Sequence, residues 1–204
     1  KTVYIVYIKY LNRKKSMKRL VMMLVAFLLV GTGAMFAQED TRAARKAAKE
    51  AEKAAQEAAE MQAFETAKKA IFDKDFVLEA DRVEFKRGNF KYVTPSTNFV
   101  SLIDGKATVQ LSFDGAFSGP NGIGGITVEG TPSNVEVETD KKGNVNFKMM
   151  VQGIGISASI TIRMIEGSSK CTATVSPNFN SNRISFTGTV YPSAESSVFK
   201  GRAL

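Results

Sequence analysis

Residues 145–164, VNFKMMVQGIGISASITIRM, carry the pattern that decides the fold of this chain. Apolar and polar side chains alternate on both sides of a turn signal at Gln152-Gly153. A period of two gives each strand one apolar face and one face toward water, which is typical of antiparallel sheet. The apolar positions are Val145, Phe147 and Met149 before the turn, and Ala158, Ile160, Ile162 and Met164 after it.

The same alternation recurs outward from this hairpin, in residues 76–85, 107–113, 134–138, 171–175 and 184–190. Glycine and asparagine lie in the short links between the runs, where they supply a positive φ at low cost. Eight or more short strands without intervening helices indicate an antiparallel meander, either a barrel or a sandwich. We favour the barrel because closure removes exposed edges and because the links are short sequential hairpins. About 130 residues are enough for one such core.

The first strand contains a phase change. Phe76, Leu78 and Ala80 alternate in one phase, and Val83 and Phe85 follow in the other. One extra residue near Asp81-Arg82 would produce this shift, so the sequence predicts a β-bulge there.

A helix is expected before the sheet. Residues 41–71 are rich in alanine, glutamate and lysine and contain no glycine or proline. The apolar face of this helix carries only methyl groups until Met61, and then gains Phe64 and Ile71. We therefore expect the first half to be a solvated spacer and the second half to pack on the domain. A short coiled coil is the alternative, although an alanine seam is weak support for it.

The first 37 residues resemble a secretory signal with upstream sequence. Met17-Lys18-Arg19 supplies a charged start, residues 20–30 an apolar run, and residues 31–37 a small-residue exit. We expect translation from Met17 and a cut before Gln38, with Ala34 as the other exit; an uncleaved anchor is the alternative. The predicted organisation is upstream residues and signal over 1–37, helix over 38–73 and β domain over 74–204. It implies a periplasmic or otherwise secreted protein with no stable membrane span after cleavage.

The formal charge of +8 comes mainly from that leader. Residues 1–37 hold seven basic and no acidic side chains, so the rest has 21 basic against 20 acidic residues. A nucleic-acid partner, which a basic chain would otherwise suggest, is therefore not expected.

The chain has no histidine and only one cysteine. It therefore lacks an imidazole base, a Ser-His or Cys-His pair and the ligands of a zinc site. We predict no catalytic residue, no metal and no cofactor. Cys171 alone forms no internal disulfide and is expected to be a buried, inert thiol.

Two loops and two inward positions are the candidate ligand-binding elements. Residues 119–125, GPNGIGG, do not favour a phosphate cradle, because a strand follows them and no Lys-Ser/Thr pair closes the motif. A rim loop with Asn121 and Gly122 in a turn is favoured. Asn178, Phe179 and Arg183 lie in a second polar loop, which either builds a turn or binds a ligand. Val109 and Phe147 are expected to face the lumen.

Two further features have simpler explanations. The glutamates Glu136 and Glu138 lie on one strand face at a spacing that would suit a glycosidase, but they are expected to face water. Phe199 is either an apolar anchor next to the cations Lys200 and Arg202 or, as we expect, part of a last strand whose ring plugs the barrel.

Six segments of the chain occur together in one order. They are FVLEADR (76–82), TNF (97–99), GPNGIGGIT (119–127), DKKG (140–143), SPNF (176–179) and VFKGR (198–202). Together they resemble domain of unknown function family 4251, small secreted proteins of Bacteroidota. The resemblance covers residues 64–204 and implies a lipocalin-like β-barrel; it implies no activity and no catalytic residues.

We expect a mainly β secreted envelope protein that binds a small apolar or amphipathic ligand in or at the rim of its barrel. An eight-stranded barrel either holds one small ligand or is filled by its own side chains. The alternatives are a structural scaffold with a filled core, whose N-terminal helix meets an envelope protein partner, and a carboxylate-dependent hydrolase.

Overall fold

The computed structural model describes residues 40–113, 119–179 and 182–204; the predicted signal over 1–37 lies outside them. The chain divides into two compact units, residues 1–49 and 50–204. The helix α2 (Asp40–Asp73) begins in the first unit and ends in the second. Of the described helices, none is long and apolar enough to cross a membrane.

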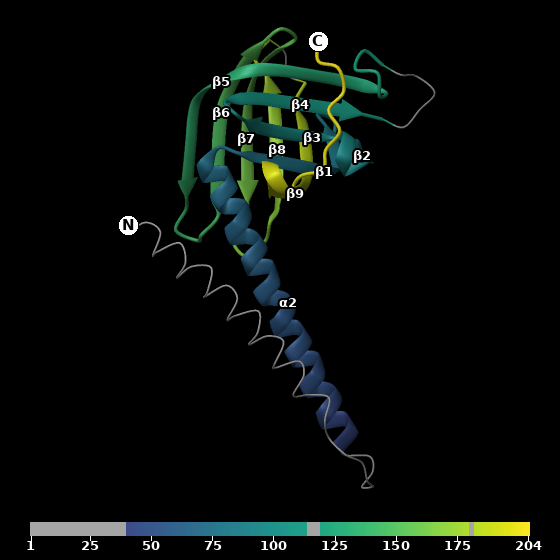
Figure 1. The fold of residues 1–204 in the computed structure, drawn as a ribbon, viewed down its shortest axis with the longest axis vertical. Coiled ribbons are helices and arrows are strands. Elements are labelled where there is room, and N and C mark those ends of the chain that lie inside the picture. Colours follow the sequence, from purple (N-terminus) through teal and green to yellow (C-terminus); the bar gives the residue numbers. More distant parts are fainter. Residues whose placement is uncertain (1–39, 114–118, 180–181) are drawn as a thin grey trace, which may run out of the picture. The chain divides into compact units, whose positions relative to one another are not determined.

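The described strands form one antiparallel sheet in the order β2-β1-β3-β4-β5-β6-β7-β8-β9. Pairing of β1 with β9, from Phe76↔Pro192 to Phe85↔Ile184, closes eight of them into a barrel, as predicted. The short β2 adds to the second half of β1. The strands, labelled in Figure 1, are β1 (Phe76–Phe85), β2 (Phe90–Tyr92), β3 (Phe99–Ile103), β4 (Lys106–Ser112), β5 (Gly125–Thr139), β6 (Val145–Gly153), β7 (Ile156–Met164), β8 (Lys170–Pro177) and β9 (Ile184–Pro192).

The predicted β-bulge is confirmed. The register of β1 against β9 shifts between Ala80 and Arg82, which keeps both Ala80 and Val83 in the core. Gly188 lies opposite Ala80, and a Cβ atom on it would lie 1.9 Å from the carbonyl oxygen of Glu79. Only glycine fits where β1 and β9 approach so closely.

A second bulge was not predicted. The register of β5 against β6 shifts between Ser133 and Glu136, and Asn134 has a φ of +50°. The hairpin turn between β6 and β7 also differs slightly from expectation. It lies at residues 154–155, directly after the predicted Gln152-Gly153, with Gly155 at a φ of +79°.

One end of the barrel is closed by the last turns of α2. Phe64, Ala67, Ala70 and Ile71 are buried in the same hydrophobic cluster as the inward side chains of the strands. Residues 50–63 of the helix are exposed. The second half of the helix therefore packs on the β domain through its last three turns, as its face of larger apolar residues predicts.

Candidate functional site

At the end of the barrel where β1 finishes and β9 starts, several large apolar side chains of the described residues point inward and are only partly buried. Among them, Ile126 is 39% exposed. The rings of Phe85 and Phe113 meet with their centroids 6.1 Å apart. We call this end the mouth and define it by the residues Phe85, Leu111, Phe113, Ile126 and Ile184.

A hollow of about 380 Å³ lies at one side of the mouth, between the β1–β2 turn and the link from β8 to β9. Phe85 and Ile184 give it an apolar floor. Arg87 and Arg183, both exposed, line it from opposite segments. The volume suits a small ligand, because ligand sites begin at about 300 Å³.

Below the mouth, the barrel is filled by its own side chains. Val83 and Phe186, the inward pair that follows Phe85 and Ile184, are buried. Phe147, one of the predicted lumen residues, is 0% exposed and packs edge-to-face on Phe76, with 5.3 Å between ring centroids. A space large enough for a ligand would leave its wall accessible, and these side chains are not. Val109, the other predicted lumen residue, lies in the buried layer next to the mouth.

Asn121 from the glycine loop does not point into the hollow. It is buried, and its Oδ1 accepts hydrogen bonds from the backbone N–H groups of Ile123 (3.1 Å) and Gly125 (2.9 Å). Its side chain therefore shapes the loop. The neighbouring Gly122 is exposed in a turn with a φ of +80°, as its predicted turn geometry requires.

Of the loop residues 178–183, Arg183 alone of the three predicted candidates lines the hollow. Asn178 is exposed, and its Nδ2 donates a hydrogen bond to Ser157 Oγ (2.9 Å), which joins the end of β8 to β7. Phe179 is 88% exposed. The structure thus brings Arg183 together with two apolar residues, Phe85 and Ile184, that sequence reasoning did not select.

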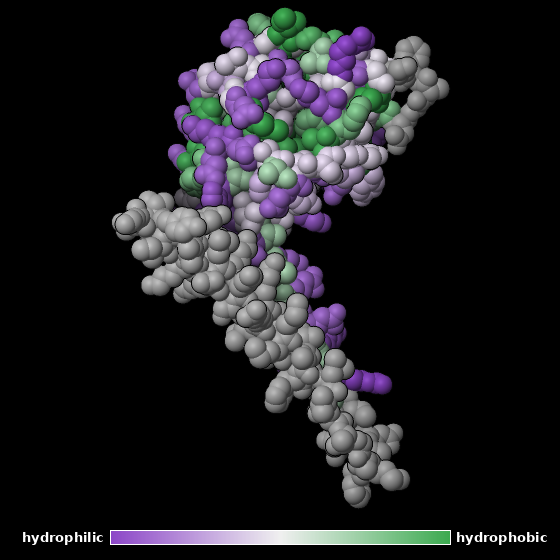
Figure 2. Space-filling model, viewed as in Figure 1, coloured by the Kyte–Doolittle hydropathy of each residue, from purple (hydrophilic) through white to green (hydrophobic). Residues whose placement is uncertain are grey.

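A buried polar strip on the outer face of β4 and β5 was also missed. Figure 1 shows the C-terminal segment crossing the outside of these strands, and Figure 2 shows hydrophilic side chains spread over this face with hydrophobic ones between them. Beneath the segment, Gln110 and Thr127 are both buried. Alternation predicts that they face water, and they do point outward, but residues 196–204 cover them. No local sequence signal marks this cover.

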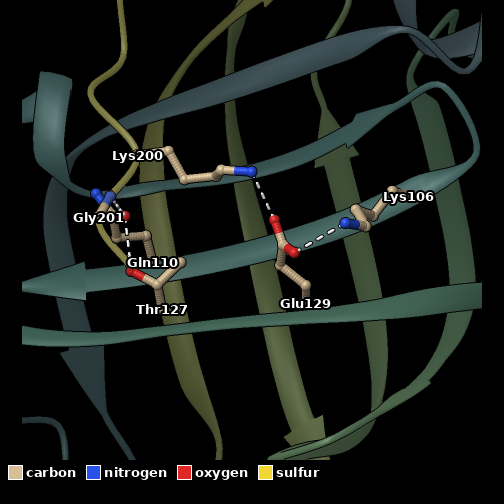
Figure 3. Close-up of polar contacts among 6 residues, drawn as sticks. All are labelled: Lys106, Gln110, Thr127, Glu129, Lys200 and Gly201. Atoms are coloured by element: carbon tan, nitrogen blue, oxygen red, sulfur yellow. Dashed lines mark hydrogen bonds and ion pairs between the residues drawn. The ribbon is translucent and has the colours of Figure 1, made fainter. Parts of the chain in front are cut away.

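Gln110 is the centre of the strip, as Figure 3 shows. Its Nε2 donates to the carbonyl oxygens of Thr97 (3.0 Å) and Phe199 (2.8 Å). Its Oε1 accepts from Thr127 Oγ1 (2.7 Å) and the backbone N–H of Gly201 (2.8 Å). All four hydrogen-bonding positions of the amide are used, which is what burial of this group requires.

The prediction that Phe199 plugs the barrel is wrong. Its side chain is 61% exposed on the outside of the barrel. Its backbone N–H donates to the carbonyl oxygen of Ser96 (2.7 Å). Residues 196–204 are not a barrel strand but an outer strap, held to the barrel through backbone groups.

Glu129 lies beside the strap and forms two ion pairs, one with Lys200 of the strap and one with Lys106 of β4 (Figure 3). Its carboxylate oxygens lie 2.7 Å from Lys200 Nζ and 2.9 Å from Lys106 Nζ. The hydrogen bond from Lys200, and after it the one from Lys106, hold the pKa of Glu129 below its usual value. A groove of about 470 Å³ runs past all three side chains. The two lysines already neutralise the carboxylate of Glu129, so we do not take this groove as the functional site.

Replacing Glu129 with glutamine should lower the free energy of unfolding by less than about 1 kcal/mol at pH 7, because both lysines are half exposed. The folded pKa is lowered, so this stabilisation is present above the unfolded pKa of about 4.3 and is lost as the pH falls through the folded pKa. Urea unfolding at pH 7 and pH 3 measures it. An equal difference between Glu129→Gln and the parent at both pH values would contradict the assignment.

Carboxylate and thiol side chains are the groups that could bind a metal ion or act in catalysis. Over residues 40–113, 119–179 and 182–204, no cluster of three or more His, Cys, Asp or Glu side chains could hold a metal ion. Glu136 and Glu138 are exposed. Cys171 is buried, and burial raises the pKa of its thiol. It is therefore a packed core side chain, as predicted.

Fold and site together define a closed antiparallel β-barrel with a filled interior, a helix over one end and a small apolar hollow with a basic rim at the other. The chain belongs to the family Domain of unknown function (DUF4251), whose model matches residues 58–190. This confirms the resemblance seen in the sequence.

A solved structure and a search of curated proteins complete the comparison. The crystal structure of a DUF4251 family protein from Bacteroides eggerthii is similar to this chain, with 44% identity over 72% of this chain and 99% of that chain, and a TM-score of 0.60. No curated protein matches.

Proposed function

We propose that this protein is a secreted, non-catalytic binding module that holds a small apolar or amphipathic ligand at the mouth of its barrel. The observation that carries the proposal is the hollow over Phe85 and Ile184, which combines an apolar floor with polar groups at its rim. Such a combination is usual in small-ligand sites. The signal-like sequence of residues 17–37 supports export to the periplasm or beyond.

Binding at the mouth is a better proposal than binding deep in the lumen. The buried layer of Val83 and Phe186 begins one inward pair below Phe85 and Ile184. Large side chains such as Phe147 and Met149 occupy the layers beneath it. A ligand would therefore be held at the rim, with part of its surface in contact with water.

The filled interior also supports a second candidate, a structural scaffold. In that case residues 50–63 of α2, which are exposed and strongly charged, would present a surface to an envelope protein. The two candidates differ in whether the mouth binds small molecules at all.

Binding of N-phenyl-1-naphthylamine, a neutral apolar dye that fluoresces away from water, tests the mouth. The purified protein should enhance its fluorescence, and Ile184→Ser should reduce the affinity about tenfold, because contact with one buried aliphatic side chain is worth about 1.5 kcal/mol. The matched control is Ile165→Ser. Ile165 is exposed in the turn between β7 and β8, at the opposite end of the barrel.

The dye experiment separates the two candidates. Enhancement that Ile184→Ser weakens and Ile165→Ser leaves unchanged supports the binding module. No enhancement, or equal loss in both variants, leaves the scaffold as the better explanation. Native mass spectrometry of the exported protein would then identify a retained ligand by its mass and locate the signal cleavage.

A further inference from the structure

We infer that the ligand of the mouth is a small anionic amphiphile, with a carboxylate-like head held by Arg87 and Arg183 and an apolar tail that reaches no deeper than the layer of Phe85 and Ile184. This inference rests on the proposed function and adds the chemical class of the ligand to it. Two independent observations carry it, one of charge and one of depth.

Arg87 and Arg183 give the hollow a positive charge. Arg87 comes from the β1–β2 turn and Arg183 from the residues that lead into β9, so the two arginines line the hollow from different segments. Neither forms an ion pair with another described residue. The acidic side chain next to Phe85 on β1, Glu84, is already bonded to Arg82 at 2.7 Å.

A further cation, Lys91, also lies close to the mouth. Lys91 on β2 places its Nζ 5.0 Å from the centroid of the Phe113 ring. Guanidinium groups bind carboxylates through paired N–H donors and are less strongly hydrated than ammonium groups. A basic rim over an apolar floor therefore favours a molecule with an anionic head and an apolar tail.

The filled barrel limits the length of that tail. Phe85 pairs with Ile184 in the floor, and the next inward pair, Val83 and Phe186, is buried. This buried pair lies about 7 Å along the strands from the floor pair, because two residues of a strand span that distance. A tail that lies between Phe85 and Ile184 therefore meets packed side chains within the length of a short acyl chain. A longer chain has to leave its remaining methylene groups in water or on the outer surface.

The test is a set of NMR titrations of the purified, ¹⁵N-labelled protein with hexanoate, hexan-1-ol and hexylamine, which share one tail and differ in the charge of the head. Hexanoate should shift the amide signals of Phe85 and Ile184 and bind about tenfold more tightly than hexan-1-ol. Hexylamine should bind most weakly. From butanoate to hexanoate, affinity should rise about fourfold per methylene group, and decanoate should gain little more.

The double variant Arg87→Gln/Arg183→Gln should lose about tenfold in hexanoate affinity and keep its affinity for hexan-1-ol. The matched control is Lys141→Gln/Lys142→Gln, which removes the same charge from an exposed turn at the other end of the barrel. Equal loss in both double variants would show a general charge effect and overturn the role of the two arginines.

The remaining outcomes distinguish this inference from the proposed function. If hexan-1-ol or hexylamine binds at the mouth as tightly as hexanoate, the anionic class is wrong and the binding module stands. A steady gain in affinity up to decanoate overturns the limit on tail length. If no probe shifts the signals of the mouth, the inference and the proposed function fail together.

Discussion

Replacing Phe147 with alanine should lower the free energy of unfolding by about 4 kcal/mol. Phe147 is fully buried and packs edge-to-face on Phe76, so the substitution removes its burial, its aromatic contact and the filling of the space it occupies. Urea unfolding at pH 7 measures the change. The matched control is Phe179→Ala, which removes an exposed ring and should alter stability by no more than about 0.5 kcal/mol.

The size of this loss in the free energy of unfolding also tests whether side chains fill the interior of the barrel. The cavity left by Phe147→Ala is apolar, so benzene should bind in it and restore part of the lost stability. Benzene should not stabilise the parent protein to the same degree. A loss below about 1 kcal/mol would contradict a packed role for Phe147 and would favour a lumen with room for a ligand.

Replacing Gln110 with glutamate should lower the free energy of unfolding by about 3 kcal/mol at pH 7. The substitution keeps the shape of the side chain and the acceptor for Thr127 and Gly201. It removes the donor for the carbonyl oxygens of Thr97 and Phe199 and sets a charged oxygen against them. The strap should detach, which hydrogen exchange at the amides of Gly201, Arg202 and Leu204 would detect.

The loss should depend on pH. Burial beside two carbonyl oxygens raises the folded pKa of the introduced carboxyl group above its unfolded value of about 4.3. The part of the penalty that comes from the charge is therefore complete above the raised pKa and disappears as the pH falls below about 4. A smaller loss remains, because a protonated carboxyl group has one O–H donor for the two carbonyl oxygens. Gln152→Glu, at an exposed position on β6, is the control for general charge effects. A pH-independent loss equal to that of the control would count against the buried amide network.

The two bulges show how far the sequence predicts the barrel. In β1, large apolar residues mark both phases, so the shift near Asp81 is visible in the sequence. In β5, the inward positions just before the shift are Gly130 and Pro132. Neither has a large apolar side chain that would mark the inward face in the sequence. The bulge at Asn134 was therefore not predictable from alternation.

The candidate site was only partly predictable. Arg183 was selected because it lies in a polar loop between two strands. Alternation predicts that Phe85 and Ile184 point into the barrel like the other inward residues. It does not show that they lie at the end of the packed interior, where they line the hollow. Asn121 was selected as an exposed rim residue and instead holds its own loop through buried hydrogen bonds.

Local sequence patterns are enough to predict the strands, the faces of each strand, most of the turns and the half of the helix that packs on the barrel. Alternation and turn chemistry involve only residues that are close together in the chain. The filling of the lumen, the position of the mouth and the burial of the polar strip become visible only in the folded barrel. These depend on residues that are far apart in the chain, such as Gln110 and Gly201, which are separated by 91 positions. Packing and hydrogen bonding between such residues exist only once the barrel has closed.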